Sequence, residues 1–285
     1  MAVHPGGGFA YVTNLASNTV SQFVLADNGS LAPLPVAFVV AGLSPAAVTV
    51  DPTGRFAYVV NRAGNNVSQF AVSAGGGLTP LATALVNAGT MPGSVAVTPN
   101  GRYAYVTNSG GANLSQYTVA ADASLQPMAA PFVATDSTPS SIVIHPSGRS
   151  AYVANSGSNT VSQFAIAADG SLSPIAAAVT TQSRPVTLVV DPLGRYLYVV
   201  NRDSDSVSQY AVAVDGSLAA LGTPVVATGN LPVSVVADPT GNFVYVGNAS
   251  SGTVSQFAIS VGGLLLPLAP ATVPATVGLG VIAIR

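Results

Sequence analysis

Short apolar runs separated by turn signals follow one another along the whole chain. In one representative stretch the runs cover residues 47–50, 55–60, 67–72 and 78–86. The first two runs are joined by 51-DPTG-54, whose residues suit the first, second and fourth positions of a type I turn. Runs of this length, rich in aromatic and β-branched residues, predict β-strands. Four such strands joined by short turns predict an antiparallel meander.

This pattern recurs six times. When the copies are aligned on the last residue of each Tyr-Val-x-Asn, they fall at Asn14, Asn61, Asn108, Asn155, Asn201 and Asn248. Successive copies are 47 residues apart, except for one step of 46. A fixed period in the forties indicates repeated supersecondary units. We therefore expect a single domain made of repeat units at about 1–44, 45–91, 92–138, 139–184, 185–231 and 232–278.

The hydrophobic pattern also predicts how the units pack. The second strand of each unit is apolar on both faces, so each sheet needs cover on both sides. Stacking the sheets around an axis gives that cover and protects their edges. The sequence thus predicts an all-β protein, a β-propeller with six four-stranded antiparallel blades.

The end of the chain leaves two alternatives open. Residues 281–284 align with the first strand of a unit, and we expect this C-terminal strand to close the ring. The first alternative is that the chain is a fragment of a seven-bladed or longer array. The second is that its C-terminal strand pairs with another chain.

The composition excludes several classes of function. Only 6% of the 285 residues are charged, the net charge is −2 and the mean hydropathy is +0.52. The chain has eight Arg and ten Asp but no Lys, Glu or Cys. These values give no electrostatic case for binding nucleic acid, and the lack of Cys excludes disulfides and thiol chemistry. Turn signals interrupt every long apolar stretch, so no transmembrane segment is expected.

The composition also suggests a compartment. A chain without Lys or Cys that is rich in Ala, Thr, Ser and Gly is typical of secreted bacterial surface proteins. No signal peptide is present. Either the protein is cytoplasmic or a leader has been removed; we expect the second, which makes it a secreted, periplasmic or cell-surface protein.

The repeat motif resembles that of a known family. The tetrapeptides 11-YVTN-14 and 105-YVTN-108, the related 58-YVVN-61, the NxVSQ(F/Y) strands and the DGSL turn at 169–172 are similar to those of the YVTN-repeat, lactonase-like β-propellers. The resemblance implies a propeller, usually of seven blades, so the six units here depart from it. It also implies lactone-hydrolysing or lactonising chemistry of the 6-phosphogluconolactonase type in some members, and surface proteins without assigned chemistry in others. The lactonising members use a Glu, which this chain lacks.

Residues that break the repeat are better candidates for function than residues that follow it. Three repeated positions hold 17 of the 19 Phe and Tyr residues, and there is no Trp, so a surface for stacking sugars or bases is not expected. One of these positions carries Phe or Tyr in five units but Ser150 in the fourth. Both histidines, His4 and His145, replace the Asp of the proline turn, and we expect them to cap that turn.

The charged residues that break the repeat gather in one kind of place. Except for the terminal Arg285, they lie in loops after second strands or in crossovers between units, which share one face of a propeller: Arg62, Asp136, Arg184, Arg202, Asp203 and Asp205. We expect Arg184 to lie near Arg202, and Arg62 to face Arg202 across the axis. On one interpretation Arg62, Arg184, Arg202 and Asp136 bind an anionic ligand. On the other they are ordinary solubilising charges, with Arg202 paired to Asp203 or Asp205.

Metal and nucleophilic chemistry are poorly supported. The segment 203-DSD-205 is similar to the start of a calcium loop, but the later ligands, including a terminal Glu, are missing. Neither histidine has a ligand partner at zinc-site spacing. No Gly-x-Ser-x-Gly motif is present. We therefore expect no cofactor, with a Ca²⁺ site at Asp203 and Asp205 as the alternative.

The residues alone favour a protein without catalytic activity. The first hypothesis is a secreted or surface scaffold that binds a protein, glycan or small molecule on the channel face. The second is a lactone hydrolase in which Arg62, Arg184 and Arg202 hold an anionic substrate and Asp203 or Asp205 is the general base. The third is a structural protein that assembles with itself through its spare terminal strand.

Overall fold

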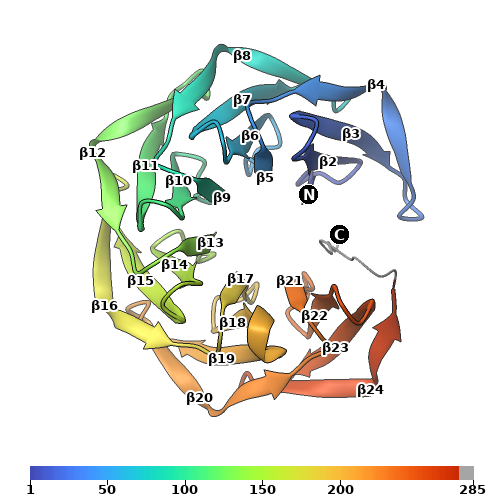
Figure 1. The fold of residues 1–285 in the computed structure, drawn as a ribbon, viewed down its shortest axis with the longest axis vertical. Coiled ribbons are helices and arrows are strands. Elements are labelled where there is room, and N and C mark those ends of the chain that lie inside the picture. The colour runs from blue at the N-terminus through green and yellow to red at the C-terminus, as the bar shows by residue number, and fades with distance from the viewer. Residues whose placement is uncertain (276–285) are drawn as a thin grey trace. The chain divides into compact units, whose positions relative to one another are not determined.

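A computed structural model describes residues 1–275 of the chain (Figure 1). All regular structure in this range is β, apart from the short 3₁₀ turn η1 (Arg202–Ser204). The strands form six four-stranded sheets in which neighbours in the sequence pair antiparallel. The prediction of an all-β propeller with six blades is therefore confirmed, and each predicted repeat unit contains one blade. The expected closing strand at 281–284 lies outside the described residues.

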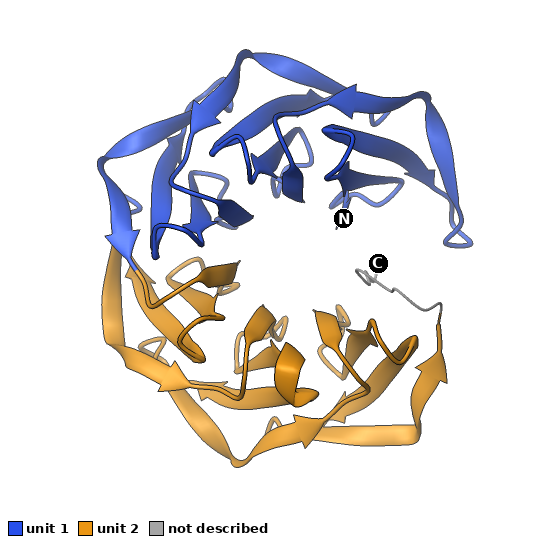
Figure 2. Cartoon of the chain, viewed as in Figure 1, with its two compact units in different colours: residues 1–134, 168–171 blue, residues 135–167, 172–285 orange. Residues whose placement is uncertain are grey.

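The chain divides into two compact units of three blades each (Figure 2). The first comprises residues 1–134 together with 168–171, and the second comprises the rest. The expectation of a single domain stays a prediction. The strands of the first unit are β1 (Ala2–Val3), β2 (Phe9–Asn14), β3 (Thr19–Leu25), β4 (Leu31–Val40), β5 (Pro45–Val50), β6 (Phe56–Asn61), β7 (Asn66–Val72), β8 (Leu78–Asn87), β9 (Pro92–Val97), β10 (Tyr103–Asn108), β11 (Asn113–Val119) and β12 (Leu125–Ala134).

The second unit repeats the same plan. Its strands are β13 (Pro139–Ile144), β14 (Ser150–Asn155), β15 (Thr160–Ile166), β16 (Leu172–Thr180), β17 (Pro185–Val190), β18 (Tyr196–Asn201), β19 (Ser206–Val212), β20 (Leu218–Ala227), β21 (Pro232–Ala237), β22 (Phe243–Asn248), β23 (Thr253–Ile259) and β24 (Leu265–Pro274). Its cores lie between neighbouring blades, where Tyr152, Val161 and Leu188 belong to one cluster and Tyr198, Val207 and Phe257 to another. Apolar residues on both faces of the second strand are thus buried on both sides, as expected.

The proline turns form as predicted. In the second blade the backbone N–H of Gly54 donates to the carbonyl of Asp51 at 2.9 Å, and the carboxylate of Asp51 accepts from the N–H of Thr53 and Phe56. Nδ1 of His145 accepts from the N–H of Ser147 at 3.1 Å, so the expected capping role of this histidine is confirmed. Nδ1 of His4 accepts from the N–H of Gly6 in the same way.

The Tyr-Val-x-Asn motif and the Val-Ser-Gln strand join each blade to the next. The hydroxyl of Tyr198 donates to the carbonyl of Gly263 at 2.8 Å, and Tyr152 donates likewise to Gly216. Oε1 of Gln209 accepts from the N–H of Leu265 at 2.7 Å, while its Nε2 donates to the carbonyl of Thr223 in the same blade. In these Tyr and Gln pairs the side chain belongs to the earlier blade, whereas Tyr117 and Tyr210 of the third strands donate to carbonyls of the preceding blade. The repeated Tyr and Gln are therefore structural.

The asparagine that ends the motif fastens the following loop. Nδ2 of Asn201 donates to the hydroxyls of Ser206 at 3.2 Å and Ser208 at 2.9 Å, and Asn201 is fully buried. Corresponding bonds to residues five and seven positions later form in all six blades. This pairing holds the ends of the second and third strands together.

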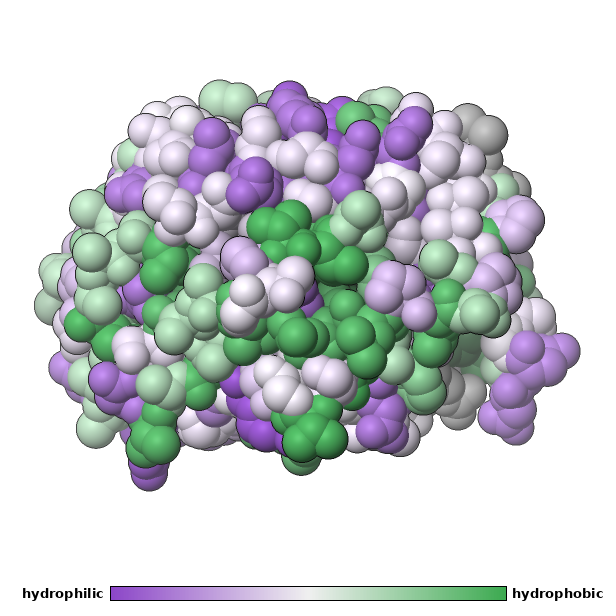
Figure 3. Space-filling view, turned by 90° about the horizontal axis from the view of Figure 1, so that it is seen from below, coloured by the Kyte–Doolittle hydropathy of each residue, from purple (hydrophilic) through white to green (hydrophobic). Residues whose placement is uncertain are grey.

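The outer strand of every blade is apolar and largely exposed. None of β4, β8, β12, β16, β20 and β24 contains a charged residue, and Phe38 and Phe132 are more than half exposed. Figure 3 shows apolar residues gathered on the side that carries β20 and β24. Prolines interrupt these strands, which limits pairing with strands of other molecules. No helix among residues 1–275 is long and apolar enough to cross a membrane.

Candidate functional site

The candidate site of the second unit is built where the crossover from β16 to β17 meets the loop after β18. The N–H of Arg202 donates to the carbonyl of Arg184 at 3.0 Å, and the N–H of Asp203 donates to the carbonyl of Ser183 at 3.3 Å. The N–H of Ser183 donates back to Oγ of Ser204 at 2.7 Å. The expectation that Arg184 lies near Arg202 is confirmed, and this kind of loop does share a face with the crossover. The role of Ser183 and Ser204 had no signal in the sequence.

Arg184 and Asp203 form an ion pair. Nη1 of Arg184 lies 3.6 Å from Oδ2 of Asp203, and the two side chains are 51% and 43% exposed. Such an exposed pair contributes at most about 1 kcal/mol to stability. Both groups therefore face solvent and remain accessible to a ligand. The expectation that Asp203 pairs with Arg202 is wrong, because its charged partner is Arg184.

Arg202 has an unusual environment. It opens η1, its side chain is partly buried, and its Nε is a buried donor without a hydrogen-bond partner among the described residues. A buried donor that makes no hydrogen bond costs about 1–3 kcal/mol. This Nε is closed to solvent, so an external anion would meet the rest of the guanidinium, whose charge makes Arg202 a candidate to bind an anion.

Asp205 has a structural role that the sequence analysis missed. Its Oδ1 accepts from the N–H of Leu231 at 2.7 Å, which fixes the crossover to the next blade. Asn18, Asn65 and Asn159 make the same bond at the same position of other blades. Each accepting side chain belongs to a residue in a left-handed backbone conformation (φ of 47–59°), which Asn and Asp tolerate well. The repeat register contains this signal, since Asn18 and Asn65 are 47 residues apart. This role explains Asp205 without catalysis.

Asp136 stands in the crossover to β13, where three other blades have glycine. Its Oδ2 accepts from the hydroxyl of Thr160 at 2.6 Å. In the blades with glycine an added Cβ would lie 2.5–2.7 Å from the side chain of the buried asparagine. Within residues 1–275 no hydrogen bond or ion pair joins Asp136 to the group formed by Arg184, Arg202 and Asp203. Asp136 is therefore not part of that cluster.

Arg62 belongs to the first unit and is described with it. It follows β6, is exposed, and its N–H donates to the carbonyl of Ser44 at 2.9 Å. The loop that contains Arg62 thus meets the crossover that contains Ser44, just as the loop of Arg202 meets the crossover of Arg184. The expectation that Arg62 faces Arg202 across an axis concerns two different units and stays a prediction.

A metal site finds no support in the geometry of the described part of the chain. Within residues 1–275 no three His, Asp or other acidic side chains gather as metal ligands. One carboxylate of 203-DSD-205 pairs with Arg184 and the other accepts a backbone N–H. These residues do not fit the calcium loop considered as the alternative. The expectation that the protein needs no cofactor stays a prediction.

A family model identifies the family of this chain, and solved structures share its fold. The family model described as a lactonase with a seven-bladed β-propeller matches residues 1–128 and 89–279. Among solved structures, a Bacteroides uniformis protein provisionally named a 6-phosphogluconolactonase is 23% identical, with a TM-score of 0.85 over 96% of this chain and 84% of that one. The periplasmic gluconolactonase of Pseudomonas aeruginosa is 22% identical, with a TM-score of 0.81 over 98% and 85%. A Lactobacillus plantarum protein is 21% identical, with a TM-score of 0.86 over 98% and 85%. No curated protein matches the chain.

Proposed function

The chain belongs to the family of seven-bladed β-propeller lactonases, and we propose that it is a lactone hydrolase. The observation that carries the proposal is the family match, which together spans residues 1–279. It overturns the expectation of a non-enzymatic binding scaffold, which rested on the failure to find a catalytic set among the repeat-breaking residues. A lactone is an activated ester, and its hydrolysis needs only a positioned water, a proton acceptor and a cation for the developing negative charge.

The cluster of Arg184, Arg202 and Asp203 supplies those groups. Asp203 accepts a proton from water as the water oxygen bonds to the carbonyl carbon of the lactone. The guanidinium charge of Arg202 stabilises the oxyanion that forms on the carbonyl oxygen. The ring C–O bond then breaks, the leaving oxygen takes the proton from Asp203, and the product is the open-chain hydroxy acid. Arg184 keeps the carboxylate of Asp203 in place through their ion pair.

The substrate class follows from the charges and the relatives. The backbones of Arg184 and Arg202 meet in this cluster, which holds one acid, Asp203, and two arginines with one acid favour an anionic substrate. The structures similar to this chain include a gluconolactonase and a protein provisionally named a 6-phosphogluconolactonase. We therefore favour a sugar lactone that carries a phosphate or carboxylate group.

Replacing Arg202 by Ala is expected to lower kcat/KM for such a lactone about 100-fold, because one donor to the oxyanion is lost. Hydrolysis releases a proton, so a pH-stat follows the reaction on a panel of neutral and phosphorylated sugar lactones, with and without Ca²⁺. Asp203→Asn should cause a comparable loss. Arg102→Ala is the matched control, because Arg102 is an exposed arginine that follows a proline turn in the other unit.

Two outcomes would count against this assignment in different ways. If no lactone is hydrolysed faster than in buffer, the proposed activity is wrong. If turnover is robust but Arg202→Ala and Asp203→Asn both retain it, the activity stands and the site lies elsewhere. Turnover that depends on Ca²⁺ would contradict the proposal that no cofactor is needed.

We also propose that the protein works outside the cytoplasm. The supporting observations are the lack of Lys and Cys and the structural similarity to a periplasmic gluconolactonase. Fractionation of the cells that express the gene tests this directly. A protein, glycan or self-association partner stays a prediction.

A further inference from the structure

On the proline-turn side of the first, third and fifth blades an aromatic ring packs on the next blade. Tyr103 lies against Gly170, and Tyr196 lies against Gly263, so closely that an added Cβ on either glycine would collide with the ring. The hydroxyl of Tyr103 donates to the carbonyl of Ala168 at 2.7 Å, and that of Tyr196 donates to the carbonyl of Val261 at 3.0 Å. The ring therefore fills a space between neighbouring blades whose far end is a backbone acceptor.

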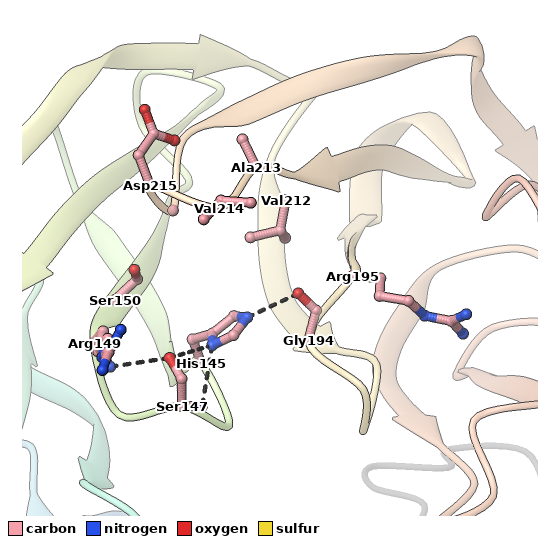
Figure 4. A pocket seen from close by; sticks show the side chains of 11 residues that line it. His145, Ser147, Arg149, Ser150, Gly194, Arg195, Val212, Ala213, Val214 and Asp215 are labelled. Atoms are coloured by element: carbon pink, nitrogen blue, oxygen red, sulfur yellow. Dashed lines mark hydrogen bonds between the residues drawn. The ribbon is translucent and has the colours of Figure 1, made fainter.

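Ser150 stands at this position in the fourth blade and leaves that space open. A pocket of about 480 Å³ lies between the fourth and fifth blades, lined by His145, Arg149 and Ser150 on one side and by residues 194–195 and 212–216 on the other (Figure 4). Oγ of Ser150 sits over Gly216, where the rings of the other blades begin. Cδ1 of Ile175 also approaches Gly216, 3.0 Å from the position of an added Cβ, so this side chain takes up part of the space that a ring fills elsewhere. A cavity of about 150 Å³ is large enough to bind benzene, so this pocket has room for a substituted ring.

Arg149 at the pocket has lost its usual partner. The guanidinium groups of the equivalent Arg55, Arg102 and Arg195 lie 5.3–5.6 Å from the centre of the ring that follows each of them. Within residues 1–275 neither a ring nor a carboxylate pairs with the guanidinium of Arg149. Figure 4 shows Arg149 beside Ser150, whereas Arg195 points away from the pocket. A cation is thus placed beside the space that a ring would occupy.

His145 forms a fixed wall of the pocket. Its Nε2 lies 2.8 Å from the carbonyl of Gly194, and its Nδ1 bonds to Ser147. Because both ring nitrogens are engaged, the imidazole is held in one orientation. It narrows the pocket and adds an apolar ring edge, but it is not free to act as a base.

We propose that this pocket binds a phenolic ring in place of the missing aromatic side chain. The ring lies over Gly216 beside the guanidinium of Arg149, and its hydroxyl donates to the carbonyl of Val214. Val214 holds the position that Ala168 and Val261 hold at the filled interfaces. The ring makes the cation–π contact that Arg149 lacks. This site is separate from the cluster of Arg184, Arg202 and Asp203 and does not depend on the proposed activity.

The test measures the binding of phenol to the protein. The signal is the ¹⁹F NMR spectrum of 4-fluorophenol, which phenol displaces from the same pocket. We expect saturable binding with a dissociation constant on the order of 1 mM, the scale for a fragment of seven heavy atoms. Ser150→Tyr, which restores the repeat residue, should abolish binding because its own ring fills the pocket. Cyclohexanol should bind about 5-fold more weakly, since it has the same size but no π face. Equal binding of cyclohexanol, or unchanged binding by Ser150→Tyr, would overturn the proposal.

A second variant keeps the test valid if Ser150→Tyr does not fold. Arg149→Ala leaves the pocket open and should weaken phenol binding about 3-fold through loss of the cation–π contact; no change in affinity contradicts the proposed pose. A free phenol and an exposed tyrosine of a peptide offer the same ring. Binding of phenol but not of N-acetyltyrosine amide assigns the pocket to free phenols, binding of both extends it to peptides, and binding of neither overturns it.

Discussion

Gln209→Leu is expected to lower the free energy of unfolding by about 3 kcal/mol. Gln209 is 1% exposed and serves two blades at once. Its Oε1 accepts from the N–H of Leu265, and its Nε2 donates to the carbonyl of Thr223. Leucine has a similar size but can make neither bond. The buried N–H of Leu265 would then be left without an acceptor, and an unmet buried donor costs more than the bond itself contributes.

Urea unfolding followed by circular dichroism measures this effect. Gln126→Leu is the matched control, because Gln126 is exposed and bonds only to the hydroxyl of Ser124 two residues away. That variant should stay within about 0.5 kcal/mol of the parent protein. Equal stability of the two variants would show that Gln209 does not link the blades in solution.

Raising the pH above 10 is expected to unfold the protein as a whole. Burial raises the pKa of Tyr11, Tyr117 and Tyr152 to about 12. Burial also raises the pKa of Tyr58, Tyr105, Tyr198 and Tyr210, so that seven of the ten tyrosines are affected. Tyr11, Tyr58, Tyr105, Tyr152 and Tyr198 are the hydroxyl donors that join the blades.

The direction of the effect follows from proton binding. A phenol with a folded pKa of about 12 and an unfolded pKa of about 10 keeps its proton longer in the folded state. The stability it gives is fully present below pH 10 and is lost as the pH rises from 10 to 12. Each such tyrosine removes about 3 kcal/mol by pH 12, and several together exceed the 5–15 kcal/mol that a typical domain has.

Absorbance at 295 nm reports tyrosine ionisation, and far-UV circular dichroism reports the fold. We expect both signals to change in one cooperative step between pH 10 and 12. If most tyrosines ionise near pH 10 while the circular dichroism signal stays native, the hydroxyls are not buried in the way described. Salt at 0.5 M serves as a control, since desolvation rather than surface charge is the first cause of each shift.

The repeat made the fold predictable. The predicted strands 47–50, 67–72 and 78–86 fall within β5, β7 and β8, and the predicted strand 55–60 matches β6 except that Arg55 precedes it. The chemistry of 51-DPTG-54 is local, so its turn could be derived from four residues. The partners of Tyr198 and Gln209 could not be derived, because they lie 65 and 56 residues further along the chain.

The candidate site was only partly predictable. The proximity of Arg184 and Arg202 followed from the order of strands and crossovers. The burial of Nε of Arg202 and the pairing of Asp203 with Arg184 depend on side-chain packing that no local pattern encodes. The structural role of Asp205 is hard to predict for a different reason. Other blades have Asn at this position, and Asn159 makes the same bond, so the change from Asn to Asp conceals a repeated role. The activity entered through the family match rather than through any set of residues.

The links between blades run head to tail, and this makes the blades interchangeable modules. The fifth blade, for example, offers the Tyr198 hydroxyl and the Gln209 amide oxygen on one face, and the Gly216 carbonyl and the Leu218 N–H on the other. A duplicated copy of about 47 residues would therefore find matching partners on both of its faces. Blade number can then change by duplication or loss of one module without new chemistry at any junction.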